Sequence, residues 1–157
     1  CGERMLTRRL EQRPDGRTPV MIWGVIDETA DLERLLGDLD GNLALDLSGV
    51  QRINSIGVHR WIATIEELTA HRRVTVEAVP YTVGMQANYV ANFLGRAEIL
   101  SSLAPYACHH CDTSDALLIH RDEVTLRAPT RWCPACKREL DFDELDGYLD
   151  FLVRPRP

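Results

Sequence analysis

Two pairs of cysteines in the last third of the chain constrain the fold more than any other feature of the sequence. Cys108 and Cys111 form one Cys-x-x-Cys pair, Cys133 and Cys136 form a second, and 21 residues separate the two pairs. Four thiolates at this spacing can meet at the corners of a tetrahedron, which is the geometry that Zn²⁺ prefers. The spacing predicts a structural zinc site, because four protein ligands leave no open position for water.

Other uses of the four cysteines are weaker alternatives. A redox-active Cys-x-x-Cys normally occurs once, and two disulfides would need an oxidising compartment, for which the sequence shows no signal peptide. An iron–sulfur cluster is a further alternative, since it also takes four cysteines. His109 and His110 lie inside the first pair and are expected beside the metal rather than as ligands.

The segment between the two cysteine pairs has the pattern of a short hairpin. Residues 117–120 and 124–126 are predicted strands, joined by a turn at 121–123. Two such cysteine knuckles joined by a hairpin resemble zinc ribbons. The predicted ribbon module covers residues 104–157, and residues 141–152 of its acidic tail are predicted to form an amphipathic helix. That helix is expected to pack back on the protein, with a role in binding a partner or a second copy as the alternative.

The region from residue 5 to about residue 103 alternates between strand-like and helix-like patterns. The order β-β-α-β-α-β-α predicts an α/β domain with a mixed sheet, in which a hairpin is followed by parallel crossovers. The predicted elements are strands at 5–12 and 18–26 around a turn at 13–16, a helix from Asp27 or Thr29 to Gly41, a strand at 42–47, a loop at 48–55, a helix with inward residues from Val58 to Leu68, a strand at 74–79, and a helix at 82–94 with Val83, Ala87, Val90, Ala91 and Leu94 inward.

A recognisable motif lies where the third strand leads into the second helix. Residues 46–58 read Asp-Leu-Ser-Gly-Val-Gln-Arg-Ile-Asn-Ser-Ile-Gly-Val. This stretch resembles the signature loop of STAS domains, the domains of sulphate transporters and anti-sigma-factor antagonists. That family commonly has Asp-Leu-Ser-x-Val and then Asp-Ser-Ser-Gly or Asp-Ser-Thr-Gly. Ser55 and Gly57 match this pattern, Asn54 stands in place of Asp, and Ile56 replaces the following Ser or Thr.

The resemblance covers residues 5–103, including the order of the elements, and implies a function. Ser55 matches the serine that partner kinases phosphorylate in anti-sigma-factor antagonists. The chain is therefore expected to be a non-enzymatic regulatory module of a bacterial partner-switching system, with an anti-sigma factor or a related serine kinase as its partner. The expected partner-binding residues are Ser48, Asn54, Ser55, Ile56, Gly57 and His59.

The chemistry of Ser55 can also be argued without the family. A serine just before a helix can cap free backbone N–H groups, and the same groups would stabilise a phosphate there. Phosphorylation would add about 1.5 to 2 negative charges at the edge of a binding surface. The alternatives are a Ser55 that only caps the helix, a scaffold or assembly subunit, and a small-ligand or nucleotide sensor. The sensor would use a polar pocket of Asp46, Ser48, Asn54 and Ser55, whereas His59 is expected to face solvent.

Composition limits the other classes of function. The formal net charge is −6, which disfavours nucleic-acid binding, because phosphates need clustered Lys and Arg. There is no run of about 18 apolar residues, so no transmembrane helix is expected and the cytoplasm is the expected location. No constellation of residues suggests catalysis, and a homodimer stays open. Cys1, at the start of the sequence, is set apart from the four metal ligands.

Overall fold

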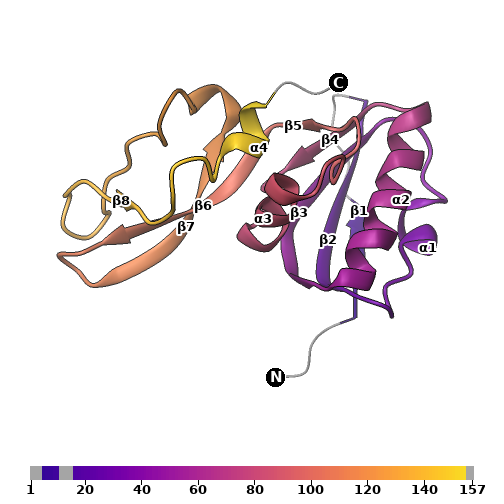
Figure 1. The fold of residues 1–157 in the computed structure, drawn as a ribbon, viewed down its shortest axis with the longest axis horizontal. Helices are drawn as coiled ribbons and strands as arrows, with labels where there is room; N and C mark the ends of the chain where they lie inside the picture. The colour runs from indigo at the N-terminus through magenta and orange to yellow at the C-terminus, as the bar shows by residue number, and fades with distance from the viewer. Residues whose placement is uncertain (1–4, 11–15, 155–157) are drawn as a thin grey trace.

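A computed structural model describes residues 5–10 and 16–154 and shows a mixed α/β fold with two sheets (Figure 1). The larger sheet has the strand order β1-β2-β3-β4-β5 and the smaller sheet the order β7-β6-β8. β1 is antiparallel to β2, whereas the pairs β2–β3, β3–β4 and β4–β5 are parallel. The elements are β1 Thr7–Leu10, β2 Thr18–Ile26, α1 Leu32–Leu36, β3 Leu43–Ile53, α2 Ser55–His71, β4 Val74–Glu77, α3 Tyr81–Tyr89, β5 Glu98–Ile99, β6 Ser101–Cys108, β7 Thr113–His120, the 3-10 helix η1 Arg121–Glu123, β8 Asp141–Phe142 and α4 Asp150–Val153.

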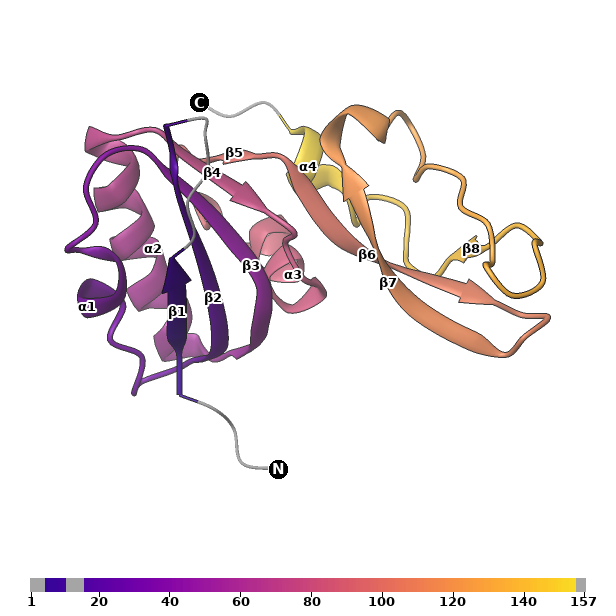
Figure 2. The ribbon, with the colours of Figure 1, turned by 180° about the vertical axis from the view of Figure 1, so that it is seen from behind.

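The mixed sheet predicted from the sequence is confirmed. The first two strands pair as an antiparallel hairpin in which Thr7 lies opposite Trp23, although most of the predicted turn at 13–16 lies outside the described residues. Helices α1, α2 and α3 each connect two parallel neighbours, as a parallel pair requires. The two opposite views show α2 and α3 on one face of this sheet (Figures 1 and 2).

The main core lies between the larger sheet and its helices. Successive side chains of a strand point to opposite faces of the sheet. Val20, Ile22 and Leu45 occupy alternate positions on their strands, and all three are fully buried. Trp61 of α2 is also buried, and its indole Nε1 donates a hydrogen bond of 2.9 Å to the carbonyl oxygen of Phe93. The apolar spacing of α2 predicted from the sequence thus becomes the packed face of the helix.

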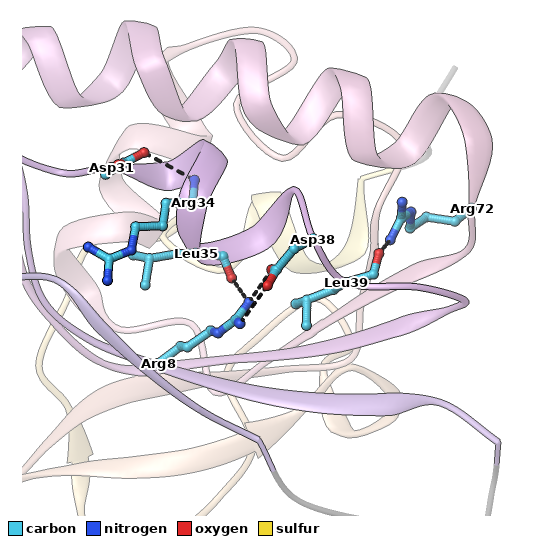
Figure 3. A network of polar contacts seen from close by, with 7 residues as sticks. All are labelled: Arg8, Asp31, Arg34, Leu35, Asp38, Leu39 and Arg72. Atoms are coloured by element: carbon cyan, nitrogen blue, oxygen red, sulfur yellow. Dashed lines mark hydrogen bonds and ion pairs between the residues drawn. The ribbon is translucent and has the colours of Figure 1, made fainter.

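Helix α1 is shorter than the sequence predicts. It begins at Leu32, and the carboxylate of Asp31 accepts the capping hydrogen bond from the backbone N–H of Arg34, so neither Asp27 nor Thr29 is the cap. The helix ends at Leu36, with Gly37 as its C-cap, before Gly41. Arginines from other elements bind the end of this helix and the chain that follows it (Figure 3). These contacts take the place of further helical turns. Arg8 donates to the carbonyl oxygen of Leu35 and to Asp38, and Arg72 donates to the carbonyl oxygen of Leu39.

Strand β3 is longer than predicted, because it continues to Ile53 through most of the segment expected to be a loop. Parallel pairing with β2 extends to Ile26 opposite Ile53, with register shifts that bend the strand. Gly49 permits the close pairing, since a Cβ atom there would lie 2.9 Å from the carbonyl oxygen of Ile22 and closer still to Trp23. Strand β2 supplies the backbone hydrogen-bond partners that extend β3, and the local sequence of β3 does not indicate this pairing.

Helix α3 is also shorter than predicted, and a short strand follows it. The helix ends at Tyr89, and the chain then turns through Asn92 and Gly95, both of which have positive φ. Val83 and Leu94 are buried as predicted, but Ala91 is exposed, so its inward assignment was wrong. Beyond the turn, β5 adds a fifth strand to the sheet, parallel to β4, which was not predicted because two residues are too few to show a period.

The smaller sheet differs from the predicted ribbon hairpin. Residues 117–120 do form a strand, but as part of β7, which pairs with β6 over eight residues. Residues 124–126, the predicted second strand, lie outside any strand and follow η1. The first cysteine pair therefore lies at the tip of the β6–β7 hairpin, where the chain reverses between Cys108 and Thr113. β6 was missed because the predicted boundary at residues 103 and 104 divides it.

The acidic tail does not form the helix predicted for residues 141–152. Residues 141–142 form β8, which pairs with β6, and only Asp150–Val153 are helical. Gly147 has a φ of 92°, a backbone conformation that interrupts a right-handed helix. The apolar stripe is buried at Leu149 and Leu152, whereas Leu145 is 80% exposed.

The C-terminal segment packs back on the protein, as predicted. Tyr148 stacks on Tyr81 of α3 with ring centroids 5.5 Å apart. The side chain of Asn88 donates to the carbonyl oxygen of Tyr148 and accepts from the backbone N–H of Phe151. Residues of both predicted regions consequently share one buried core, which extends from the larger sheet to α4.

Candidate metal centre and the start of helix α2

The four predicted cysteine ligands meet at one place. Their sulfur atoms all lie within 4.8 Å of one another. The Sγ atoms of Cys108 and Cys136 are 3.6 Å apart, and those of Cys111 and Cys133 are 3.9 Å apart. A zinc–sulfur bond of about 2.3 Å places the corners of a sulfur tetrahedron about 3.8 Å apart, so the spacing fits a tetrahedral metal ion. In the part of the chain that the structure describes, no other group of three or more such side chains is this close.

The two cysteine pairs have similar local structures, although their sequences differ. The residue that follows each pair, Asp112 or Lys137, has a positive φ of 51° or 64°. This turn folds the chain back over the first cysteine of each pair. The backbone N–H of Cys111 lies 3.4 Å from the sulfur of Cys108, and the N–H of Lys137 donates to the carbonyl oxygen of Cys133. Each pair thus presents two sulfur atoms to one side.

The sulfur atoms differ in their affinity for protons. Backbone N–H groups of Cys136 and Ala135 lower the pKa of Cys133 to about 6, so that this thiol is ionised at neutral pH. The neighbouring Cys136 thiol and burial raise the pKa of Cys111 to about 12. A bound dication stabilises all four thiolates together, because its charge offsets their mutual repulsion. The donor set therefore fits a metal ion better than four free thiols.

Contacts outside the cysteines position the second pair. Arg131 forms an ion pair of 2.7 Å with Glu123, whose other carboxylate oxygen accepts from the backbone N–H of His120 at the end of β7. The hydroxyl of Tyr106 on β6 donates a hydrogen bond of 2.6 Å to the carbonyl oxygen of Pro129. These contacts fix the segment that leads into Cys133 against the β6–β7 hairpin.

The two histidines inside the first pair lie outside the sulfur cluster. His109 and His110 are exposed, and the Nε2 atom of His109 is 3.2 Å from a carboxylate oxygen of Asp141. This contact joins the tip of the hairpin to β8 without adding a metal ligand.

The start of α2 differs from the sequence interpretation in one respect. Asn54, rather than Ser55, is the cap, and its side-chain oxygen accepts a hydrogen bond of 2.8 Å from the backbone N–H of Gly57. Ser55 is the first helical residue and is exposed. The sequence contained the signal for this cap, because Asn is a preferred capping residue.

This helix terminus is fixed to the loop after β2. The backbone N–H of Asn54 donates to the carbonyl oxygen of Ile26, and its side-chain nitrogen donates to a carboxylate oxygen of Glu28 at 2.7 Å. Arg60 donates to the carbonyl oxygen of Glu28. Gly57 is buried against the backbone of Ile26, at a distance that leaves no room for a Cβ atom.

Not all the predicted partner-binding residues come together. Ser55 and His59 are exposed on the first turns of α2, and Ile56 beside them is 50% exposed. Ser48 lies six residues before Asn54 on β3, which corresponds to about 20 Å along an extended strand. The structure therefore separates Asp46 and Ser48 from Asn54 and Ser55, and the polar pocket predicted from these four residues does not form.

An open groove that the sequence did not predict lies between α1 and α2. Its volume is about 920 Å³, and buried Ala30, Leu32 and Leu68 are among its lining residues. Arg60 and Arg72 border the groove, but each donates to backbone carbonyl oxygens of the α1 region. The two arginines at the edges of the groove therefore make hydrogen bonds that stabilise the fold.

Comparison with known proteins gives no family assignment. No protein-family model matches the chain, and no curated protein matches it. The resemblance to STAS domains rests on the motif at residues 46–58 and on the order of the elements. Within the described part of the chain, no helix is both long enough and apolar enough to cross a membrane.

Proposed function

We propose that the chain is a non-enzymatic protein-interaction module that resembles an anti-sigma-factor antagonist and binds its partner through the start of α2. The observation that carries this proposal is the exposed pair Ser55 and Ile56 on a rigid helix terminus. An isoleucine that is half exposed beside a hydroxyl offers apolar contact area to a partner. The hydrogen bonds of Asn54 hold this surface in place before binding, which lowers the entropy cost of association.

Phosphorylation of Ser55 would act on the partner more than on the fold. A phosphate at the first residue of a helix lies near the positive end of the helix dipole, so the folded state tolerates it. The same charge would make the burial of Ile56 under a partner costly, because the phosphate would lose water of hydration. Ser55 would thus switch binding, as the resemblance to the antagonists implies.

We propose zinc as the metal ion of the four-cysteine site, with a structural role. Zinc favours four-coordinate thiolate sites, and four protein ligands leave no position for a substrate or a reactive water molecule. The ion would join the tip of the β6–β7 hairpin to the segment at residues 133–136, which contains little regular structure of its own. We expect metal binding to supply much of the folding free energy of this part.

A comparison of three baits tests the proposed interaction. The wild-type protein, Ser55→Asp and Ser114→Asp are used for affinity capture from the native host, and bound proteins are identified by mass spectrometry. Ser114 is an exposed serine of β7, so its variant controls for the added charge. Retention of an anti-sigma factor or serine kinase by wild type and Ser114→Asp, with loss on Ser55→Asp, supports the proposal. Equal capture by all three baits would favour the scaffold interpretation.

Metal analysis tests the proposed ion. Wild type, Cys133→Ser and His109→Ala are purified without added metal, and their metal content and thermal unfolding are measured. We expect one zinc ion per chain in wild type and in His109→Ala, and loss of metal with an unfolded C-terminal part in Cys133→Ser. Iron in the purified wild type, or an unchanged metal content in Cys133→Ser, would contradict the proposal.

A further inference from the structure

A second candidate site lies where β5, η1 and α4 meet, away from the cysteines and from the start of α2. An open hollow of about 520 Å³ is lined there by Arg96 just before β5, by Glu98 of β5, by Arg121 of η1, and by Val153 and Arg154 at the end of α4. The two views show α4 close to β5 (Figures 1 and 2). The hollow therefore combines residues that are far apart in the sequence.

One carboxylate holds two of the arginines near this hollow. Glu98 forms ion pairs of 3.1 Å with Arg73 and with Arg121. Hydrogen bonds from Arg73 and Arg121 lower the pKa of Glu98, so it stays ionised at neutral pH. One negative charge thus serves two guanidinium groups, and a net positive charge remains.

The other two arginines donate hydrogen bonds to the described protein only through their backbone N–H groups. The N–H of Arg96 donates to the hydroxyl of Thr69, and the N–H of Arg154 donates to the carbonyl oxygen of Asp150. Both residues are exposed, and among the residues that the structure describes neither guanidinium group has an ion-pair partner. Their charges are available to a ligand.

The local charge contrasts with that of the chain. Three arginines and one glutamate line the hollow in a protein whose formal net charge is −6, and a fourth arginine, Arg73, pairs with the same glutamate. Guanidinium groups bind phosphate through paired N–H donors, and a local excess of positive charge attracts anions even on an acidic protein. Phosphate is therefore the ligand chemistry that this arrangement suits best.

The remainder of the lining is apolar. Ile99 and Leu152 are buried to within a few per cent, whereas Val153 is 42% exposed at the edge of the hollow. A volume of about 520 Å³ falls in the range of small-molecule sites. An organic group attached to a phosphate could lie against Val153 while the phosphate meets the arginines.

We propose that this hollow binds the phosphate group of a small phosphorylated organic molecule, with Arg96, Arg121 and Arg154 as the anion-binding residues. Glu98 orients Arg121 and limits the number of phosphates that the hollow accommodates. A bound phosphate bridges β5, η1 and α4, so it links the C-terminal helix to the larger sheet. The inference does not depend on the proposed role of Ser55.

Calorimetric titration of the full chain at low ionic strength tests this inference. The probes are AMP, ribose 5-phosphate and inorganic phosphate, and the proteins are wild type, the double variant R96Q/R154Q, and R34Q/R138Q as a control with the same change of charge. Arg34 and Arg138 are exposed and lie outside the lining of the hollow. We expect binding to wild type that weakens with added salt, and about tenfold weaker binding for each arginine removed from the hollow.

The control separates a site from a general effect of charge. Wild-type affinity in R34Q/R138Q, together with loss of binding in R96Q/R154Q, supports the site. Absence of binding of every probe to wild type at millimolar concentration, or equal loss in both double variants, overturns it. Equal affinity for inorganic phosphate and for the organic phosphates would assign the site to the free anion and refute a role for Val153.

Discussion

Replacement of Gly57 by alanine provides a sharp test of the proposed helix terminus. In an ordinary helix this change is stabilising by up to about 1 kcal/mol, because alanine has the higher helix propensity. Here a Cβ atom would lie 2.6 Å from the carbonyl carbon of Ile26, closer still to its oxygen, and 3.1 Å from the backbone nitrogen of Asp27. All three atoms belong to the backbone, so no side-chain rotation relieves the contact.

The expected cost can be estimated from these contacts. The start of α2 must move by about 1 Å away from β2, and overpacking of this kind costs about 1–3 kcal/mol. The movement also weakens the hydrogen bond from the N–H of Asn54 to the carbonyl oxygen of Ile26, which contributes about 1 kcal/mol. After the gain in helix propensity is subtracted, Gly57→Ala should destabilise the protein by about 2 kcal/mol.

Thermal unfolding followed by circular dichroism measures this effect, with the same zinc concentration in the buffer for every variant. A loss of about 2 kcal/mol lowers the Tm of a chain of this length by about 4–8 °C. Ala63→Gly at an exposed position of the same helix gives the scale of helix propensity, with an expected loss of about 1 kcal/mol. A Tm of Gly57→Ala equal to or above that of wild type would refute the packing argument.

Three further predictions concern the cap, an ion pair and the C-terminal segment. Asn54→Ala should cost about 1 kcal/mol in denaturant unfolding, whereas Ser55→Ala should change stability little, and equal effects would contradict the cap assignment. The lowered pKa of Glu98 means that its contribution to stability, about 0.5 kcal/mol after screening, is present at neutral pH and lost as the pH falls below its ordinary value of 4.5. Urea unfolding at several pH values should therefore show that Glu98→Gln differs from wild type at pH 7 and converges with it near pH 3, and a constant difference would refute the sign. Phe151→Ala removes a buried ring that contacts Gly84 of α3 and should cost about 3 kcal/mol, with earlier protease cleavage near the C-terminus, whereas resistance equal to wild type would show that the docking is unimportant.

The cysteine cluster was the part of the molecule most open to prediction from sequence. The spacing within each cysteine pair is a local property, because two residues between the cysteines allow one turn to present both sulfur atoms. The structure brings together the four cysteines that the spacing indicated. The hairpin that carries the first pair was not predicted, because its first strand β6 continues from the larger region and has no turn signal at its start.

Helix α2 and the strands with strong apolar alternation were also evident from the sequence. Trp61, Ile65 and Leu68 recur at helical spacing, and all are buried. Val74 and Val76 are buried on β4, as their alternation predicts. These elements have enough residues for a period to stand out against chance.

The errors occur where partners distant in sequence decide the local structure. The extension of β3 depends on pairing with β2, and the short α1 depends on arginines of β1 and of the end of α2 (Figure 3). The acidic tail has a helical pattern, but pairing of β8 with β6 and the positive φ of Gly147 prevent a continuous helix. Propensity is a weak guide where tertiary contacts contribute more free energy than helix preference.

The sequence by itself indicated the four cysteines that cluster, the mixed α/β class and helix α2, because spacing and apolar periodicity are properties of short stretches of chain. Only the tertiary structure decided which polar residues share a site. It separated Ser48 from Ser55 along an extended strand and brought Arg96, Arg121 and Arg154 to one hollow. The physical reason is that strand pairing and docking set distances between residues that are far apart in the sequence, and no local pattern records those distances.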